Sequence, residues 1–156
     1  MSKKFDHWCD KKYQKKETNF DTGTLAHKLV TTLTEWVMHD ITVSDELDAN
    51  EKFIQRQRMS RVLETAERIE CLIKDANSIF AIYDSDYEER RRRWIAARGY
   101  CIRLSVILTH MGEYFAPRTN IQKYVDCEVT VKTLAGKIKN MMISDDKRRK
   151  IQVKEY

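Results

Sequence analysis

Residues 85–115 decide the fold and read SDYEERRRRWIAARGYCIRLSVILTHMGEYF. After four consecutive arginines, apolar residues recur at alternating intervals of three and four from Trp94 to Phe115. This spacing keeps one apolar stripe, here called the seam, on one side of an α-helix, as in helical bundles. Because Ser85 and Glu88 have the spacing of a capping box, we expect the helix to cover 86–115.

Three further segments have the same spacing, beginning at Ala26, Met59 and Tyr124. They predict helices over 24–43, 51–83 and 119–146. The acidic and cap-forming segment 44–50 separates the first two helices, and Pro117 separates the last two. Short connections make consecutive helices antiparallel. The expected fold is therefore all-α, an antiparallel up-down-up-down four-helix bundle.

Composition places this bundle in a single domain. The chain has 156 residues, of which 42% are hydrophobic and 34% charged, so it can bury a core beneath a charged surface. We predict a basic N-terminal arm or short helix over 1–23, the bundle over 24–146, and a basic C-terminal tail over 147–156.

Several classes of protein are not favoured by the sequence. No run of about 18 apolar residues occurs, so we expect no membrane span, and the N-terminus has no hydrophobic signal segment. The four cysteines lie far apart without Cys-x-x-Cys spacing, which favours a reducing cytoplasm over a disulfide framework or zinc site. The histidines have no metal-ligand spacing, and no phosphate loop or nucleophile motif occurs. We therefore predict a protein that is not an enzyme and holds no metal or cofactor.

Three basic segments meet at one end of the predicted bundle, and the formal net charge is +5. They are the N-terminal arm, the run 90–93 and the tail that begins at Lys147. Glu88 and Glu89 precede Arg92 and Arg93 by four residues, a favourable spacing for helix ion pairs. Arg90 and Arg91 are therefore expected to be the freer charges. Clustered cations are what phosphate contact requires, so we predict nucleic-acid binding at this end.

A second apolar line on the helix over 86–115 predicts self-association. Tyr100, Ile107 and Tyr114 are spaced by seven and lie outside the seam. Either this helix lies centrally in the bundle, or the line is a subunit interface. Gly99 and Gly112 also suggest the close approach of a neighbour. We expect a homo-oligomer with the three heptad-spaced residues in its interface.

Residues 25–142 resemble the four-helix-bundle family of 23S ribosomal RNA intervening-sequence proteins and Avd-like accessory proteins of diversity-generating retroelements. The resemblance rests on residues 92–104, RRWIAARGYCIRL, which are similar to the third helix of that family, and on four helices of matching length and order. It implies a homopentamer with a basic surface that binds RNA or DNA and a partner reverse transcriptase. The basic positions that it carries over are Arg92, Arg93, Arg98 and Arg103.

The resulting prediction is an oligomeric nucleic-acid-binding accessory protein, which would assist a reverse transcriptase if the resemblance holds. The predicted nucleic-acid-binding residues are Arg90, Arg91, Arg92, Arg93, Arg98, Arg103, Lys147, Arg148, Arg149 and Lys150. The alternative is a protein-binding inhibitor or adaptor, for example phage-encoded, that acts through its basic end. A third interpretation is a structural bundle whose charges serve solubility.

Overall fold

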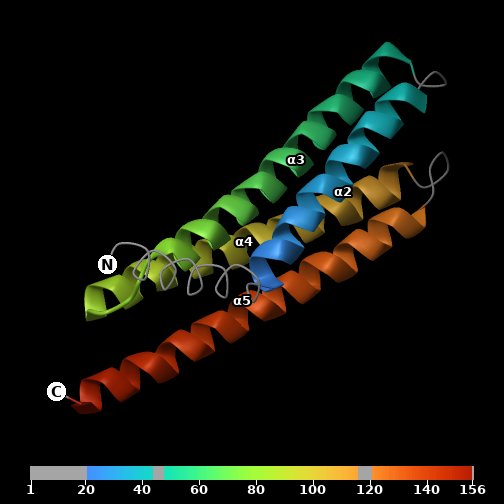
Figure 1. Ribbon diagram of the computed structural model, residues 1–156. Coiled ribbons are helices and arrows are strands. Elements are labelled where there is room, and N and C mark those ends of the chain that lie inside the picture. The colour runs from blue at the N-terminus through green and yellow to red at the C-terminus, as the bar shows by residue number, and fades with distance from the viewer. Residues whose placement is uncertain (1–20, 44–47, 116–120, 156) are drawn as a thin grey trace, which may run out of the picture.

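The computed structural model describes the backbone over residues 21–43, 48–115 and 121–155, and the side chains over 21–36, 48–113 and 122–152. These ranges contain four helices and no strand: α2 (Asp21–Val43), α3 (Ala49–Ser78), α4 (Asp84–Phe115) and α5 (Ile121–Glu155). The predicted all-α class is therefore confirmed, and the helices pack side by side as a bundle (Figure 1). Most of the predicted arm, residues 1–20, lies outside the described part of the chain.

The predicted seams form the hydrophobic core. Seam residues of all four helices meet in one buried cluster, and those of α3, α4 and α5 include side chains with no exposed surface: Ile69, Ile73, Trp94, Leu104, Leu134 and Ile138. Burying one large apolar side chain contributes about 1.5–3 kcal/mol, so a few such layers supply most of the drive to fold. The spacing of three and four thus explains why each helix packs with one fixed side inward.

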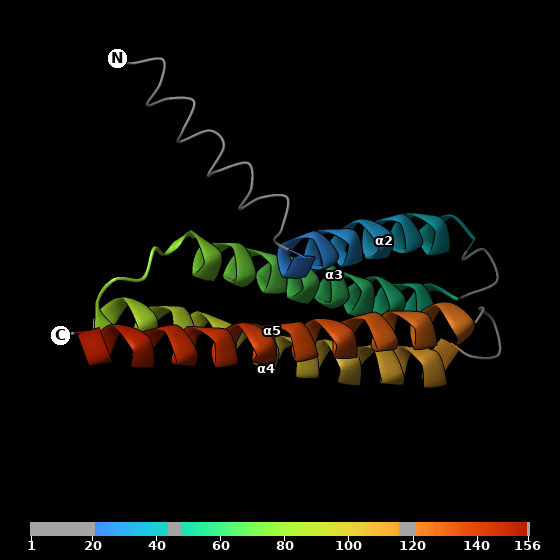
Figure 2. The ribbon, with the colours of Figure 1, turned by 60° about the horizontal axis from the view of Figure 1, so that its bottom comes forward.

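Contacts between side chains show how α4 and α5 are aligned. Arg90, near the start of α4, bonds to Asp145 in the later part of α5. Thr109, near the end of α4, bonds to Glu128 in the first turns of α5. The two helices therefore run antiparallel. In Figure 2, α5 and the first turns of α4 extend beyond the start of α2, so the bundle has fewer helices at that end.

The connection between α3 and α4 differs from its prediction. α3 ends at Ser78 rather than at residue 83, with Ile79 in an extended conformation (φ −77°, ψ 112°). α4 begins at Asp84, so the predicted Ser85–Glu88 capping box is wrong. Instead, the Asp86 carboxylate accepts hydrogen bonds from the backbone N–H groups of Ile82 (3.1 Å) and Tyr83 (3.0 Å). The Tyr83 bond and then the Ile82 bond stabilise the ionised form, which lowers the pKa of Asp86 below its ordinary value.

The predicted basic tail also differs, because α5 continues through it to Glu155. The physical reason is a set of ion pairs that ties these last turns to α4. Arg149 Nε donates to Asp84 Oδ1 at 3.0 Å, and Arg149 Nη2 donates to Glu88 Oε1 at 3.5 Å. None of the helices in the described ranges combines the length and apolar character needed to cross a membrane.

Candidate nucleic-acid interface

Arg90 lies inside the bundle, not on its surface. The residue is only 5% exposed. Its Nε and Nη2 donate to the two carboxylate oxygens of Asp145 at 2.9 and 3.0 Å, and its Nη1 donates to the carbonyl oxygens of Ala76 and Ile79 at 3.0 and 2.9 Å. Trp94 Nε1 donates to the same Asp145 at 3.1 Å. The expectation that Arg90 is a free charge is therefore wrong, because it joins the ends of α3, α4 and α5.

The other three arginines of the run are also paired. Arg91 Nη1 donates to Asp146 at 3.2 Å, so Arg91 is not a free charge either. The predicted Glu89–Arg93 pair is confirmed at 2.6 Å, and Arg92 shares Glu89 at 3.3 Å. Exposed ion pairs of this kind contribute about 0–1 kcal/mol. The charges of the run are thus largely neutralised by carboxylates of α4 and α5.

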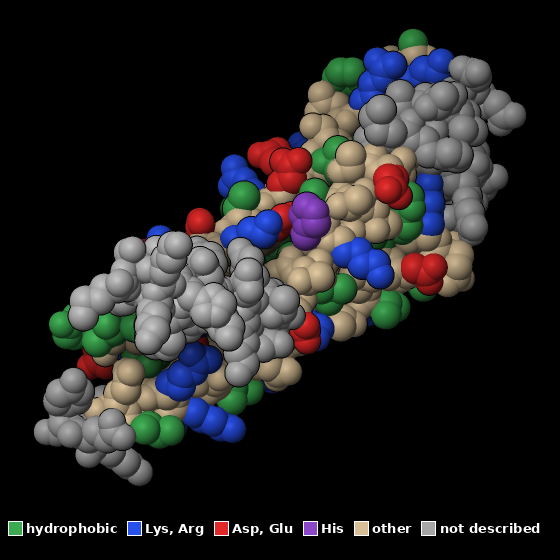
Figure 3. Space-filling view, viewed as in Figure 1, with side chains coloured by type: hydrophobic (Ala, Val, Ile, Leu, Met, Phe, Trp, Pro, Cys, Tyr) green, Lys and Arg blue, Asp and Glu red, His purple; other side chains and the backbone are tan. Residues whose placement is uncertain are grey.

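The four basic residues 147–150 near the end of α5 differ in their partners. Arg149 is paired with Asp84 and Glu88 of α4. Among the described residues, Arg148 bonds to the Ser144 hydroxyl, at 3.2 Å, and to no carboxylate, and it lies on the side of α5 that faces α3 across a cavity. Lys147 and Lys150 are exposed, and neither has a carboxylate partner in the described part of the chain. On the side seen in Figure 3, Lys and Arg are interspersed with Asp and Glu.

A second set of cations lies along what we call the outer α4–α5 face. On α5 this face consists of exposed residues spaced by three and four: Val125, Val129, Lys132, Gly136, Lys139, Ile143, Lys147 and Lys150. On α4 it consists of the exposed residues Ile95, Arg98, Ile102 and Val106. The helical period places both sets away from the buried seams. The Arg91–Asp146 and Thr109–Glu128 contacts cross the boundary between the two helices, so the two sets adjoin.

The cations of this face are not neutralised. Among the described residues, no carboxylate pairs with any of the five: Arg98, Lys132, Lys139, Lys147 and Lys150. Three of these five were predicted from the sequence. Lys132 and Lys139 were missed, although their spacing of seven on one side of α5 is a visible signal. Arg103 lies elsewhere, with its guanidinium 5.4 Å from the ring centroid of Tyr100.

The predicted oligomer residues are not an exposed line. Tyr100 and Ile107 are half-buried and pack against the core, and the Tyr100 hydroxyl accepts a hydrogen bond from Arg68 at 2.9 Å. The side chain of Tyr114 lies outside the described residues. The exposed aliphatic residues of α4 are instead Ile95, Ile102 and Val106, with 51%, 60% and 50% of their surface accessible. These three are better placed for a subunit contact.

The buried cysteines belong to the core. Desolvation raises the pKa of Cys101 to about 12, and desolvation together with the charge of Asp126 raises the pKa of Cys127 to about 12. Both thiols therefore stay protonated near neutral pH, which makes them poor nucleophiles. Within the described ranges, no three His, Cys, Asp or Glu side chains are grouped closely enough to hold a metal ion.

Comparison with known proteins identifies no family. No family model matches the chain, and neither a curated protein nor a solved structure matches it. The resemblance to intervening-sequence and Avd-like proteins therefore stays a prediction, as do the pentamer and the reverse transcriptase partner that it implies.

Proposed function

We propose that this chain is a non-enzymatic, oligomeric helical bundle that binds nucleic acid through the outer α4–α5 face. One observation carries the proposal: in the described part of the protein, Arg98, Lys132, Lys139, Lys147 and Lys150 have no carboxylate partner and share one face. At the bundle end, by contrast, Arg90, Arg91, Arg93 and Arg149 are paired with carboxylates. Unpaired cations on a continuous face can exchange their counterions for phosphates, which is the main source of affinity for nucleic acids.

The dimensions of the face suit a phosphate backbone. From Lys132 to Lys150 the axis of α5 rises about 27 Å at ~1.5 Å per residue, which equals about eight nucleotide steps at ~3.4 Å per strand. Lysine and arginine contacts to phosphate position a duplex without reading its bases. The face has no aromatic residue on which unpaired bases could stack. A double-stranded partner, bound without regard to sequence, fits this chemistry.

The proposal takes the helices in up-down-up-down order. The Trp36–Tyr124 ring contact at 6.5 Å and the His27–Glu70 bond at 2.9 Å support this order for α2, as the α4–α5 contacts do for the last two helices. We also expect a basic arm before residue 24, as the sequence predicts. A role beside a reverse transcriptase is expected from the family resemblance alone.

The test is the salt dependence of binding to a short duplex with 5′-hydroxyl ends, measured by fluorescence anisotropy. If all five cations contact phosphate, log K should fall with log[salt] at a slope of about −4.5, since each contact contributes about −0.9. The triple variant Lys132→Gln/Lys139→Gln/Lys147→Gln should reduce the slope to about −1.8 and weaken binding roughly 500-fold at ~0.1 M salt.

A charge-matched control removes three exposed cations of α2 and α3 instead, in the variant Lys28→Gln/Arg56→Gln/Arg61→Gln. Its slope should stay close to that of the unmodified protein. Equal losses in the two triple variants would mean that net charge alone is responsible, and would overturn the proposed face. A stoichiometric protein partner that survives nuclease treatment, without bound nucleic acid, would favour the adaptor alternative.

A further inference from the structure

A cavity of about 670 Å³ lies at the end of the bundle where α2 begins, between α3 and α5. Its volume is in the range of small-molecule binding sites. Polar side chains from four helices line it, among them Asn77, Arg90, Lys137, Asn140, Arg148 and Gln152. The cavity lies on the inner side of α5, away from the outer α4–α5 face.

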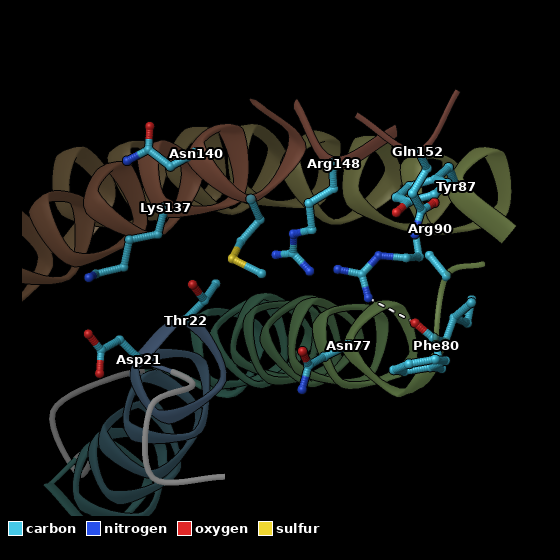
Figure 4. Close-up of a pocket in the computed structure, with 13 residues that line it drawn as sticks. Asp21, Thr22, Asn77, Phe80, Tyr87, Arg90, Lys137, Asn140, Arg148 and Gln152 are labelled. Atoms are coloured by element: carbon cyan, nitrogen blue, oxygen red, sulfur yellow. Dashed lines mark hydrogen bonds between the residues drawn. The ribbon is translucent and has the colours of Figure 1, made fainter. Parts of the chain in front are cut away.

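Two guanidinium groups point toward one another in this cavity, those of Arg90 and Arg148 (Figure 4). Arg90 uses four of its five N–H groups on Asp145 and on two carbonyl oxygens, which leaves one N–H of Nη2 without an acceptor in the part of the chain that the structure describes. Within the described ranges, the Ser144 hydroxyl is the partner of Arg148. Because Asp145 already offsets the charge of Arg90, Arg148 supplies the net positive charge here, and an anion in this partly enclosed site would offset that charge.

The other cavity residues indicate where such an anion sits. Lys137 and Asp21 lie at the other end of the cavity from Arg90 (Figure 4), so that end carries charges of both signs. Asn77 and Asn140 offer neutral amides along the walls. Gln152 Oε1 is buried and has no hydrogen-bond partner within the described part of the chain. At the Arg90 end of the cavity, the charge that has no carboxylate partner among the described residues is thus that of Arg148, which lies beside the remaining N–H of Arg90.

We propose that this cavity binds a phosphate monoester, with the phosphate between Arg148 and the remaining N–H of Arg90. A phosphate monoester carries a charge of about −1.5 to −2 near pH 7 and has three acceptor oxygens, more than an internal phosphodiester offers. Its source is either a free mononucleotide or the phosphorylated end of a nucleic-acid strand. The inference does not depend on binding at the outer α4–α5 face.

Calorimetry with AMP, adenosine and inorganic phosphate tests the site directly. AMP and phosphate should bind and adenosine should not, and AMP affinity should rise from pH 5 to pH 7 as the phosphate loses its second proton at a pKa of about 6. Arg148→Gln should weaken AMP binding at least tenfold. Arg61→Gln, which removes the same charge from an exposed position of α3 outside the cavity, should leave AMP binding unchanged. Because Arg148 is exposed, its loss should not unfold the bundle, and far-UV circular dichroism checks this.

A second arm compares short duplexes with 5′-phosphate and 5′-hydroxyl ends. At least tenfold tighter binding of the phosphorylated duplex, lost in Arg148→Gln, identifies a strand end as the source. AMP binding without this preference identifies a free nucleotide. No binding of AMP or phosphate at about 1 mM, together with no preference between the duplexes, overturns the proposal. Binding of the 5′-hydroxyl duplex is judged separately, so failure here leaves the outer-face result intact.

Discussion

At the scale of single residues, Arg90 has the most consequential position. Its side chain and that of Asp145 have 6% and 7% of their surface exposed, so the pair is almost removed from water. Removing a charge from water is costly, and the cost is offset only if its hydrogen bonds are well made. Here the Asp145 carboxylate receives two N–H groups from Arg90 and a third from Trp94.

Arg90→Met should therefore lower the free energy of unfolding by about 3–5 kcal/mol, because Asp145 would remain buried without its cation. Urea denaturation measures the loss. The double variant Arg90→Met/Asp145→Leu should recover part of it, since no buried charge is left. Arg92→Met is the control: with 75% of its side chain exposed, it should change stability by less than about 0.5 kcal/mol. A loss below about 1 kcal/mol in Arg90→Met would contradict the structural role of the pair.

Only half of this ion pair was visible in the sequence. Arg90 lies three residues after Tyr87 and four before Trp94, so the sequence places it in line with the seam. Its partner lies 55 residues further along the chain. Asp145 follows Met141 by four and so also occupies a seam position, but local spacing cannot show that two seam positions with opposite charges face each other. The expectation that Arg90 is a free charge was wrong for this reason, whereas the exposure of Lys147, Lys150 and Arg98 follows from their positions outside the seams.

At the scale of elements, apolar spacing predicted the four helices but not all of their ends. Phe80 and Tyr83 continue the seam of α3 in the sequence, yet they are 68% and 71% exposed in the structure. Arg90 binds the carbonyl oxygens of Ala76 and Ile79, which ends α3 before these residues. α5, in contrast, is longer at its C-terminal end than its apolar spacing predicted. That spacing stops near Met142, but the helix continues, because Arg149 pairs with carboxylates of α4.

Gly136 gives a prediction about the stability of α5. It lies on the exposed side of the helix, and a Cβ added there would meet no neighbouring atom within 4 Å. Gly136→Ala should therefore raise the free energy of unfolding by about 0.5–1 kcal/mol, because alanine restricts the unfolded chain and favours the helix. Urea denaturation of the dilute protein measures this. A decrease would show that another surface packs directly against Gly136.

At the scale of the whole molecule, ion pairs determine which Lys and Arg side chains remain available to a ligand. The sequence predicted a basic cluster at one end of the bundle. In the structure, carboxylates of α4 and α5 form ion pairs with four arginines of this cluster: Arg90, Arg91, Arg93 and Arg149. In the described chain, the unpaired cations that share one face lie mainly along α5 instead. A ligand with regularly spaced negative charges fits such a line better than a compact acidic site would.

The aliphatic residues beside this line lead to a prediction about assembly. Ile95, Ile102 and Val106 lie at intervals of seven and four and are each at least half exposed, so covering them removes apolar surface from water. The stripe rises only about 17 Å along α4 at ~1.5 Å per residue, which is short for the ~1,200 Å² that stable interfaces bury. Association should therefore be weak and concentration-dependent.

Sedimentation velocity over a concentration series measures this association. The unmodified protein should move from monomer toward oligomer in the micromolar range, and Ile102→Glu should stay monomeric, because a carboxylate at the centre of the contact would be buried without a partner. Ile151→Glu is the matched control, since Ile151 is as exposed as Ile102 (59% and 60%) but lies near the end of α5. A monomer at about 100 μM would rule out the stripe as an interface. If the oligomer forms, it places several lysine lines on one particle, so duplex affinity should fall in Ile102→Ser, which weakens the contact without adding a charge to the outer α4–α5 face.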